Sequence, residues 1–175
     1  MFRTEIVTEK SPLLPQIKEL YKRAFPKNER RPLGPLLLDR SGNSSFVAFM
    51  DDDLFCGFAC LLKWEDISHI IYITIEDSLR DRGYGSKALQ ILHQQYPNDR
   101  FIVDIESDRP DAPNIDQRQM RRAFYTKNGY EPAPVHYPWR GEDYDILAYN
   151  GTITHQEFRD FWHFFDVNVQ ELANY

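Results

Sequence analysis

Hydrophobic residues recur along this chain with two spacings, one typical of strands and the other of helices. Alternating apolar positions and short β-branched runs predict strands at residues 2–7, 45–50, 54–64, 67–76, 101–105, 135–139 and 144–149. Apolar positions three and four residues apart predict helices at residues 13–24, 36–40, 83–96, 116–128 and 154–173. This order predicts a mixed α/β fold, with a mostly antiparallel central sheet of about seven strands and flanking helices.

Individual residues mark where these elements begin and end. Pro26 and Pro32 indicate a loop between the first two helices. Gly129 follows the helix at 116–128 and is expected to end it in the left-handed conformation. Thr154 and Glu157 have the spacing of a capping box, which would open the last helix. No repeat or linker divides the chain, so residues 1–175 are expected to form one domain with an added C-terminal helix at 154–173.

Composition argues against several functional classes. The chain is 42% hydrophobic and 14% aromatic, which indicates a packed domain rather than disorder. A net charge of −6 disfavours nucleic-acid binding. The chain has no run of 18 apolar residues, so no membrane span is expected. The first residues lack the apolar core of a secretion signal, which predicts a cytoplasmic protein. Cys56 and Cys60 lie in an apolar strand-like run and are expected to be core residues, with no metal site.

A glycine-containing turn between a strand and a helix carries the strongest chemical signal. The strand ends near Ile75, a polar segment follows, and Gly83 and Gly85 introduce the helix. Backbone N–H groups at a helix start converge on one point, and the helix dipole adds positive potential there. Glycines let an anion approach the main chain closely. The turn is therefore a candidate pyrophosphate site.

Two other interpretations of this turn remain open on the residues alone. The glycines fit a turn that only connects a strand to a helix. Residues 83–88 also fit the dinucleotide fingerprint G-x-G-x-x-A, with Asp104 about 20 residues further on, where that motif places its ribose-binding acid. That fingerprint requires its first glycine directly at the strand end, whereas about six polar residues separate Ile75 from Gly83.

Two ordered motifs resemble those of the GNAT superfamily of N-acetyltransferases. Residues 80–85, Arg-Asp-Arg-Gly-Tyr-Gly, resemble the R/Q-x-x-G-x-G/A motif that binds the pyrophosphate of coenzyme A. Residues 122–130, Arg-Ala-Phe-Tyr-Thr-Lys-Asn-Gly-Tyr, resemble the second hallmark of that family. The helix, strand and helix between them also match, and the resemblance extends over residues 2–149. It implies the acyl-CoA N-acyltransferase fold.

The resemblance also implies where acetyl-CoA binds. In this family the strand before the turn splays from its neighbour, and the pantetheine arm lies in the gap. The residues expected to contact acetyl-CoA through this strand and the following turn are Ile73, Thr74, Ile75, Arg80, Asp81, Arg82, Gly83, Tyr84, Gly85 and Ser86.

For catalysis, the resemblance assigns Tyr125 as the acid that protonates the departing thiolate. His69 occupies the strand position at which some members carry a glutamate base, and an ordinary imidazole titrates near ~6.5. Glu76 and Glu106 are rival carboxylates, so several candidates for the base stay open. The loop at residues 28–31 is expected to line the acceptor pocket. Asn114 is a candidate for the asparagine that often follows the fifth strand in the family.

The function predicted in this way is transfer of an acetyl group from acetyl-CoA to a primary amine. The acceptor is expected to be a small molecule, an amino acid or a peptide, and transfer is expected to be direct and metal-free. The alternative is a non-catalytic acyl-CoA-binding or regulatory module on the same fold, and a nicotinamide dehydrogenase is a third option. The aromatic helix at 158–165 has enough apolar surface to cover the sheet or to form a homodimer interface.

Overall fold

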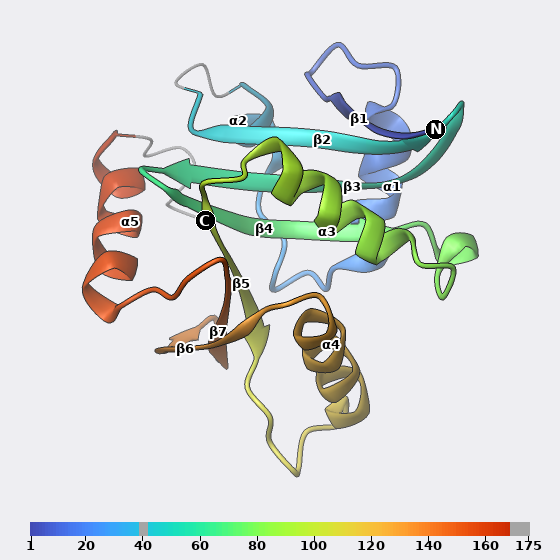
Figure 1. The fold of residues 1–175 in the computed structure, drawn as a ribbon. Helices are drawn as coiled ribbons and strands as arrows, with labels where there is room; N and C mark the ends of the chain where they lie inside the picture. Colours follow the sequence, from blue (N-terminus) through green and yellow to red (C-terminus); the bar gives the residue numbers. More distant parts are fainter. Residues whose placement is uncertain (39–41, 169–175) are drawn as a thin grey trace.

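A single seven-stranded sheet forms the centre of the molecule, as the computed structural model of residues 1–38 and 42–168 shows (Figure 1). Its strand order is β1-β2-β3-β4-β5-β7-β6, and every neighbouring pair is antiparallel except β4 and β5. The strands are β1 (Phe2–Ile6), β2 (Ser44–Asp51), β3 (Leu54–Trp64), β4 (Ile67–Ile75), β5 (Arg100–Glu106), β6 (Glu131–Trp139) and β7 (Glu142–Tyr149). The predicted mixed, mostly antiparallel sheet is confirmed.

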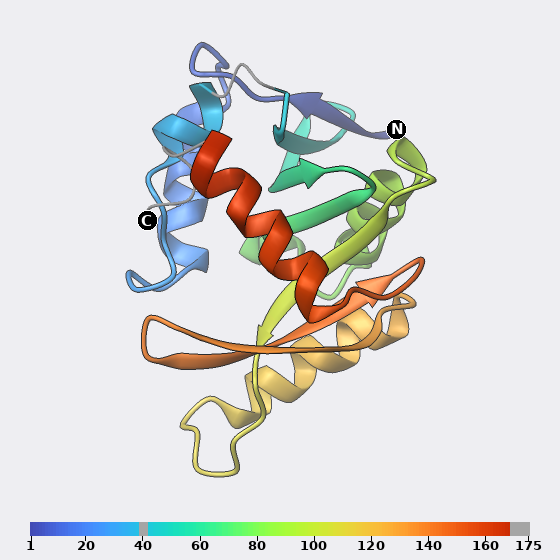
Figure 2. The ribbon, with the colours of Figure 1, turned by 90° about the vertical axis from the view of Figure 1, so that its left-hand side faces the viewer.

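Helices cover both faces of this sheet. They are α1 (Leu14–Ala24), α2 (Leu33–Leu38), α3 (Tyr84–Gln95), α4 (Ile115–Lys127) and α5 (His155–Asn168), with a short 3-10 turn, η1 (Asp77–Leu79). Apolar residues of α1, α2 and α5 form one core with alternate residues of β2 and β3, while α3 and α4 form a second core on the opposite face. Figure 2 shows α5 lying across the face that α1 and α2 also cover. No helix within the described ranges is long and apolar enough to cross a membrane.

The parallel pair β4 and β5 separates after three residues. Ile67, Ser68 and His69 pair with residues 100–102, and beyond that point β5 continues only with β7 on its other side. The edge of β4 from Ile70 to Ile75 that faces β5 therefore has no strand partner within the described residues. The divergence is visible in Figure 1, where β5 runs away from β4 toward α4. It opens the central sheet at its middle.

Two elements begin more than two residues away from their predicted starts, and both contain prolines. The helix predicted at 36–40 is α2 at Leu33–Leu38, because Pro35 fits the first helical turn, where the backbone N–H has no helical partner. Residues 39 and 40 lie outside the described residues, as do 169–173 of the predicted last helix. Strand β6 begins four residues earlier than predicted and contains three prolines. It is an edge strand, and an edge tolerates missing N–H groups.

The capping box at the start of α5 is confirmed. The Thr154 hydroxyl accepts a hydrogen bond from the Glu157 N–H at 3.1 Å, and the Glu157 carboxylate accepts one from the Thr154 N–H at 2.9 Å. Glu157 also bonds Arg100 of β5 at 2.9 Å. The box therefore fixes the start of the helix and connects it to the sheet.

We expect Thr154→Ala to lower the free energy of unfolding by about 1 kcal/mol, because one helical N–H loses its acceptor. For a chain of this size the corresponding fall in Tm is about 2–4 °C. Thermal denaturation followed by circular dichroism measures it. The control is Thr152→Ala, which removes an exposed hydroxyl with no hydrogen bond among the described residues. Equal losses in the two variants would contradict the capping role.

Candidate active site

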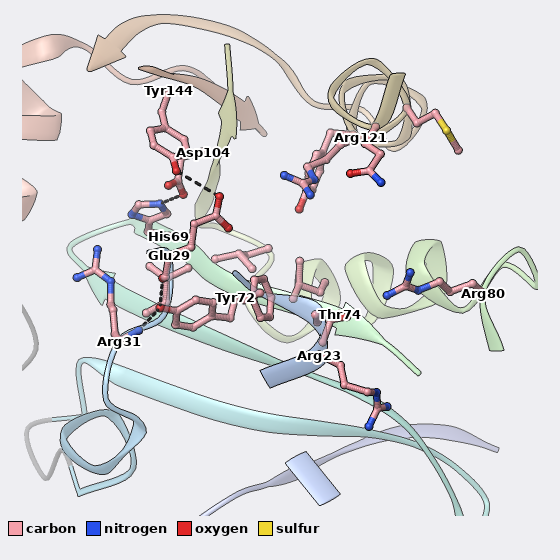
Figure 3. Close-up of a pocket in the computed structure, with 18 of the residues that line it drawn as sticks. Arg23, Glu29, Arg31, His69, Tyr72, Thr74, Arg80, Asp104, Arg121 and Tyr144 are labelled. Carbon is pink, nitrogen blue, oxygen red and sulfur yellow. Dashed lines mark hydrogen bonds and ion pairs between the residues drawn. The ribbon is translucent and has the colours of Figure 1, made fainter. Parts of the chain in front are cut away.

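A cavity of about 790 Å³ lies where β4 and β5 diverge. It is lined by β4, by one face of α4, by the end of α1 and the loop after it, by Asp104 of β5, by the turn before α3 and by the β6–β7 hairpin. Figure 3 shows Arg80 at one end of the cavity, and Glu29, Asp104 and Tyr144 at the other. We call the end near Arg80 the donor end and the end near Glu29 the acceptor end. Tyr125 lines the same cavity.

At the donor end, the glycine turn leads directly into α3. Gly83 is the N-cap of α3 and has φ 79°, in the left-handed region, with no atom near the position of a Cβ. Asp81 also has a positive φ, 60°, and with Arg80 it lines the cavity. Arg80 bonds Asp77 at 2.8 Å. The helix start is therefore exposed beside the cavity, as an anion site requires.

A glycine is required at position 85 for a different reason than at position 83. A Cβ at Gly85 would lie 3.1 Å from the ring of Phe124 on α4. The glycine thus lets α3 and α4 approach each other. Because Phe124 belongs to the second sequence motif and Gly85 to the first, the two motifs are joined by this contact. Tyr125, the next residue, is placed beside the cavity by the same packing.

Tyr125 lies in the last turns of α4 and is 7% exposed. Its ring contacts those of Phe124 and Tyr130 at centroid distances of 5.2 and 5.3 Å. Burial raises the pKa of its hydroxyl to about 12. Within the described residues no hydrogen bond engages that hydroxyl. The side chain is therefore a protonated donor that lines the cavity.

His69 is buried at the last position of β4 that pairs with β5. It is 1% exposed, and its Nε2 lies 2.9 Å from Oδ1 of Asp104. Rings of Phe161 and Trp162 from α5 contact it at 5.7 and 5.6 Å. Its Nδ1 is buried and has no hydrogen-bond partner in the described part of the chain. Since Nε2 faces a carboxylate, we assign the proton of the neutral ring to Nε2.

Asp104 joins His69 to the β6–β7 hairpin. Its second oxygen accepts a hydrogen bond from the Tyr137 hydroxyl at 2.8 Å. Burial alone would raise the pKa of this carboxyl, but the hydrogen bonds from His69 and Tyr137 outweigh burial, and the pKa is lowered. Asp104 is therefore an ionised carboxylate in the cavity wall. Sequence reasoning considered it only as a ribose-binding acid, although a charged residue inside the apolar run 101–105 was a signal of a special role.

The two rival carboxylates, Glu76 and Glu106, lie outside the cavity lining, and each is paired with arginines. Glu76 pairs with Arg23 at 2.8 Å. Glu106 is 9% exposed and pairs with Arg118 at 2.7 Å and with Arg121 at 3.4 Å. Asn114, at the start of α4, donates to Glu106 at 3.3 Å and also lies outside the lining. The structure thus places these groups in ion-pair networks, whereas it places His69 and Tyr125 at the cavity.

The loop at residues 28–31 contributes two side chains to the acceptor end. Glu29 and Arg31 both line the cavity. The guanidinium of Arg31 stacks on Trp139 and Trp162, at 5.0 and 5.2 Å from the ring centroids. Arg121 of α4 faces them across the cavity (Figure 3). The acceptor end therefore combines two carboxylates, two guanidinium groups and several aromatic rings.

A splayed parallel strand pair, a helix start at one end of the gap and a cavity with charged and aromatic side chains at the other are the features of an acyl-CoA-dependent acyltransferase. The comparisons agree with this class. Residues 14–130 match the model of the acetyltransferase (GNAT) family. No curated protein matches the sequence significantly. The chain belongs to the GNAT family and is an acetyltransferase, which does not support a nicotinamide dehydrogenase.

Solved structures show the same fold. A GNAT-family protein from Bacteroides thetaiotaomicron has a TM-score of 0.76 at 21% identity, over 95% of this chain and 97% of its own. The aminoglycoside 6'-N-acetyltransferase of Enterococcus faecium has a TM-score of 0.62 at 15% identity, over 84% and 96%. A GNAT acetyltransferase from Elizabethkingia anophelis, solved with acetyl-CoA bound, has a TM-score of 0.56 at 12% identity, over 85% and 97%.

Proposed function

We propose that the protein transfers an acetyl group from acetyl-CoA to a primary amine of a small molecule, amino acid or peptide, by direct transfer. The observation that carries this proposal is the position of Tyr125. Tyr125 lines the same cavity as the unpaired edge of β4 and the carboxylates Glu29 and Asp104 of the acceptor end. A thioester held on that edge would have a proton donor and two carboxylates in the same cavity.

The donor end would hold acetyl-CoA through the backbone. The unpaired edge of β4 near Ile73, Thr74 and Ile75 is free to hydrogen-bond the pantetheine arm as a partial strand. The N–H groups of the turn and of the first residues of α3 would bind the pyrophosphate, aided by the helix dipole. The residues of this proposed anion site are Arg80, Asp81, Arg82, Gly83, Tyr84, Gly85 and Ser86.

The acceptor end favours a cationic amine. Glu29 and Asp104 supply negative charge inside the cavity, and desolvated carboxylates attract an ammonium group more strongly than exposed ones. The neutral amine would then attack the thioester carbon and the C–S bond would break. Tyr125 would donate a proton to the departing sulfur. In the related protein from Enterococcus faecium the acceptor is an aminoglycoside, a molecule with several amines.

His69 is proposed to position Asp104 rather than to act on the amine itself. Both ring nitrogens are buried, and Nε2 is engaged with Asp104. The ring is also enclosed by Phe161 and Trp162, which limits its access to an acceptor. Glu76 is given no part in proton transfer, because its carboxylate is paired with Arg23. The hydrogen bond between His69 and Asp104 would keep the latter ionised.

Binding of acetyl-CoA tests the donor end. At about 100 times its Kd, a ligand stabilises a protein by about 2.7 kcal/mol, which for this chain raises Tm by roughly 5–10 °C. We expect that rise for the wild type and its loss in Gly83→Trp, whose side chain would enter the space beside the helix start. Differential scanning fluorimetry measures the rise in Tm, and titration calorimetry measures the Kd of acetyl-CoA.

Gly42→Trp is the matched control. Gly42 has φ 80° and no atom near the position of a Cβ, so the backbone strain of the substitution is comparable to that at Gly83. Without ligand, the Gly42→Trp variant should lose about as much stability as Gly83→Trp does. Its rise in Tm with acetyl-CoA should nevertheless equal that of the wild type. A wild type that acetyl-CoA does not stabilise, or a Gly83→Trp variant that still responds fully, would overturn the assignment of the donor end.

A further inference from the structure

The loop between α1 and α2 is irregular in conformation but firmly attached to its surroundings. The Tyr72 hydroxyl of β4 donates to the Glu29 carbonyl at 2.9 Å and accepts from the Arg31 N–H at 2.9 Å. The Tyr21 hydroxyl bonds both backbone groups of Arg31 at 2.7 Å. Arg140 donates to two further carbonyls of the loop. The position of Glu29 is therefore fixed relative to β4, the strand that would hold the thioester.

The side chain of Glu29 points into the acceptor end (Figure 3). Its only hydrogen bond within the described residues comes from the Tyr144 hydroxyl, at a long 3.3 Å. No ion pair to it is found among those residues, although its carboxylate is partly buried. A partly buried carboxylate with so little compensation is costly in isolation. The environment of Glu29 is therefore suited to binding a cation.

Apart from Asp81, which is exposed at the donor end, the other acidic side chains around the cavity are already bound. Asp104 accepts hydrogen bonds from His69 and Tyr137. Asp77 pairs with arginines at 2.8 and 3.5 Å. Beyond the lining, Glu106 and Glu76 pair with arginines as described above. Of the two carboxylates at the acceptor end, Glu29 and Asp104, Glu29 is therefore the one with an oxygen available to an incoming ammonium group.

Charged neighbours from several elements shift the pKa of the Glu29 carboxyl. Burial and the negative charge of Glu106 raise its pKa, Arg121 and the Tyr144 hydroxyl oppose that rise, and Asp104 adds to it. Arg31 of the same loop and His69 of β4 also line this end of the cavity. The net effect is a raised pKa. A carboxylate of raised pKa accepts a proton from an ammonium group more readily than an ordinary one.

We propose that the Glu29 carboxylate binds the ammonium group of the acceptor and removes its proton. This inference rests on the proposed function. In the step, an R–NH₃⁺ proton moves to an oxygen of Glu29, which becomes a neutral carboxylic acid, and the nitrogen lone pair attacks the thioester carbon. The C–S bond breaks, and a second proton of the nitrogen reaches the sulfur through Tyr125. Glu29 then returns its proton to solvent.

Glu29→Gln tests the proposal in the full chain. The acceptor used is the amine that the wild type acetylates fastest among spermidine, kanamycin, free amino acids and short peptides. We expect kcat/KM to fall by about 10²-fold or more. The acidic limb of the pH–rate profile should disappear, because the wild type loses activity as pH falls and Glu29 becomes protonated. A rise in KM with the acidic limb retained would overturn the proton-transfer role.

Stability gives an independent readout of the same substitution. A carboxyl whose pKa is raised by folding binds more protons in the folded state, so its contribution to stability falls as pH rises through that pKa. Glu29→Gln should therefore be at least as stable as the wild type at neutral pH, and it should keep its full response to acetyl-CoA. Loss of that response would indicate failure of the donor end, whereas loss of turnover alone supports the role of Glu29.

Glu131→Gln is the matched control, because Glu131 is exposed on the edge strand β6 and remote from the cavity lining. It should retain wild-type kcat/KM. If no amine of the panel is acetylated, ¹³C-carboxyl NMR with methylammonium chloride replaces turnover. We expect methylammonium to shift the Glu29 resonance and sodium chloride to leave it unchanged. Equal effects of the two salts, or wild-type turnover in Glu29→Gln, would overturn the proposal.

Discussion

Replacing Tyr125 by phenylalanine is expected to lower kcat about 10²- to 10³-fold while leaving acetyl-CoA affinity unchanged. Burial raises the pKa of this hydroxyl to about 12, well above the ~8.5 of an ordinary thiol. Proton transfer from the tyrosine to a free thiolate is therefore unfavourable on its own. It becomes favourable when the hydroxyl takes up a proton from the acceptor nitrogen in the same step. Phenylalanine keeps the ring packing but removes this relay.

Steady-state kinetics with acetyl-CoA and a thiol-reactive dye measure the effect. Because the hydroxyl stays protonated until about pH 12, the substitution should not shift the alkaline limb of the pH–rate profile. Tyr96→Phe is the control, since Tyr96 lies outside the cavity lining and contacts Lys63 through its ring. A Tyr125→Phe variant with wild-type kcat would show that Tyr125 only packs against the cofactor.

The donor end could be predicted because its chemistry is local in sequence. A helix start, two glycines and a preceding strand lie within about 15 consecutive residues, so their pattern is visible in the chain. Even the link between the two motifs has a simple cause, the contact of Gly85 with Phe124. What the pattern did not predict is the division of labour between the glycines. Gly83 permits a left-handed turn, whereas Gly85 permits two helices to pack.

The acceptor end could not be predicted because its residues meet only in three dimensions. Glu29 and Tyr144 are 115 positions apart in the chain and yet share a hydrogen bond. Whether Glu29 or one of its charged neighbours has a free carboxylate depends on which arginines reach each of them. That choice is decided by tertiary packing, which the residue pattern of the loop at 28–31 does not encode. The contacts of the candidate base His69 with rings of α5 likewise join segments far apart in the chain.

Much of the acceptor end also lies beyond the stretch that matches the family. The match ends at residue 130, whereas Trp139 and Tyr144 line the cavity and Trp162 contacts both His69 and Arg31. These residues come from the β6–β7 hairpin and from α5. The part that matches the family carries the two acetyltransferase motifs, and the remainder contributes side chains to the acceptor end of the cavity. This separation explains why family membership identifies the reaction but not the amine.

Gly57→Ala is expected to destabilise the protein by about 3 kcal/mol or more, with a fall in Tm of roughly 6–12 °C. An added Cβ would lie 2.1 Å from the Thr74 carbonyl oxygen and 2.9 Å from the Ile75 Cα, both of them backbone atoms of β4. Gly57 also has φ 155°, which side-chain-bearing residues rarely adopt. Neither strand can yield without breaking the pairing of Gly57 with Ile75.

The same substitution at Gly34 should have the opposite sign. Gly34 lies in α2 with no atom near the position of a Cβ, so alanine there gains up to about 1 kcal/mol of helix propensity. Urea denaturation of the two variants measures both effects. Because the clash displaces the β4 backbone at Thr74, any folded Gly57→Ala protein should also bind acetyl-CoA more weakly. Wild-type stability in Gly57→Ala would mean that β3 and β4 are farther apart than described, and with them the edge proposed to bind pantetheine.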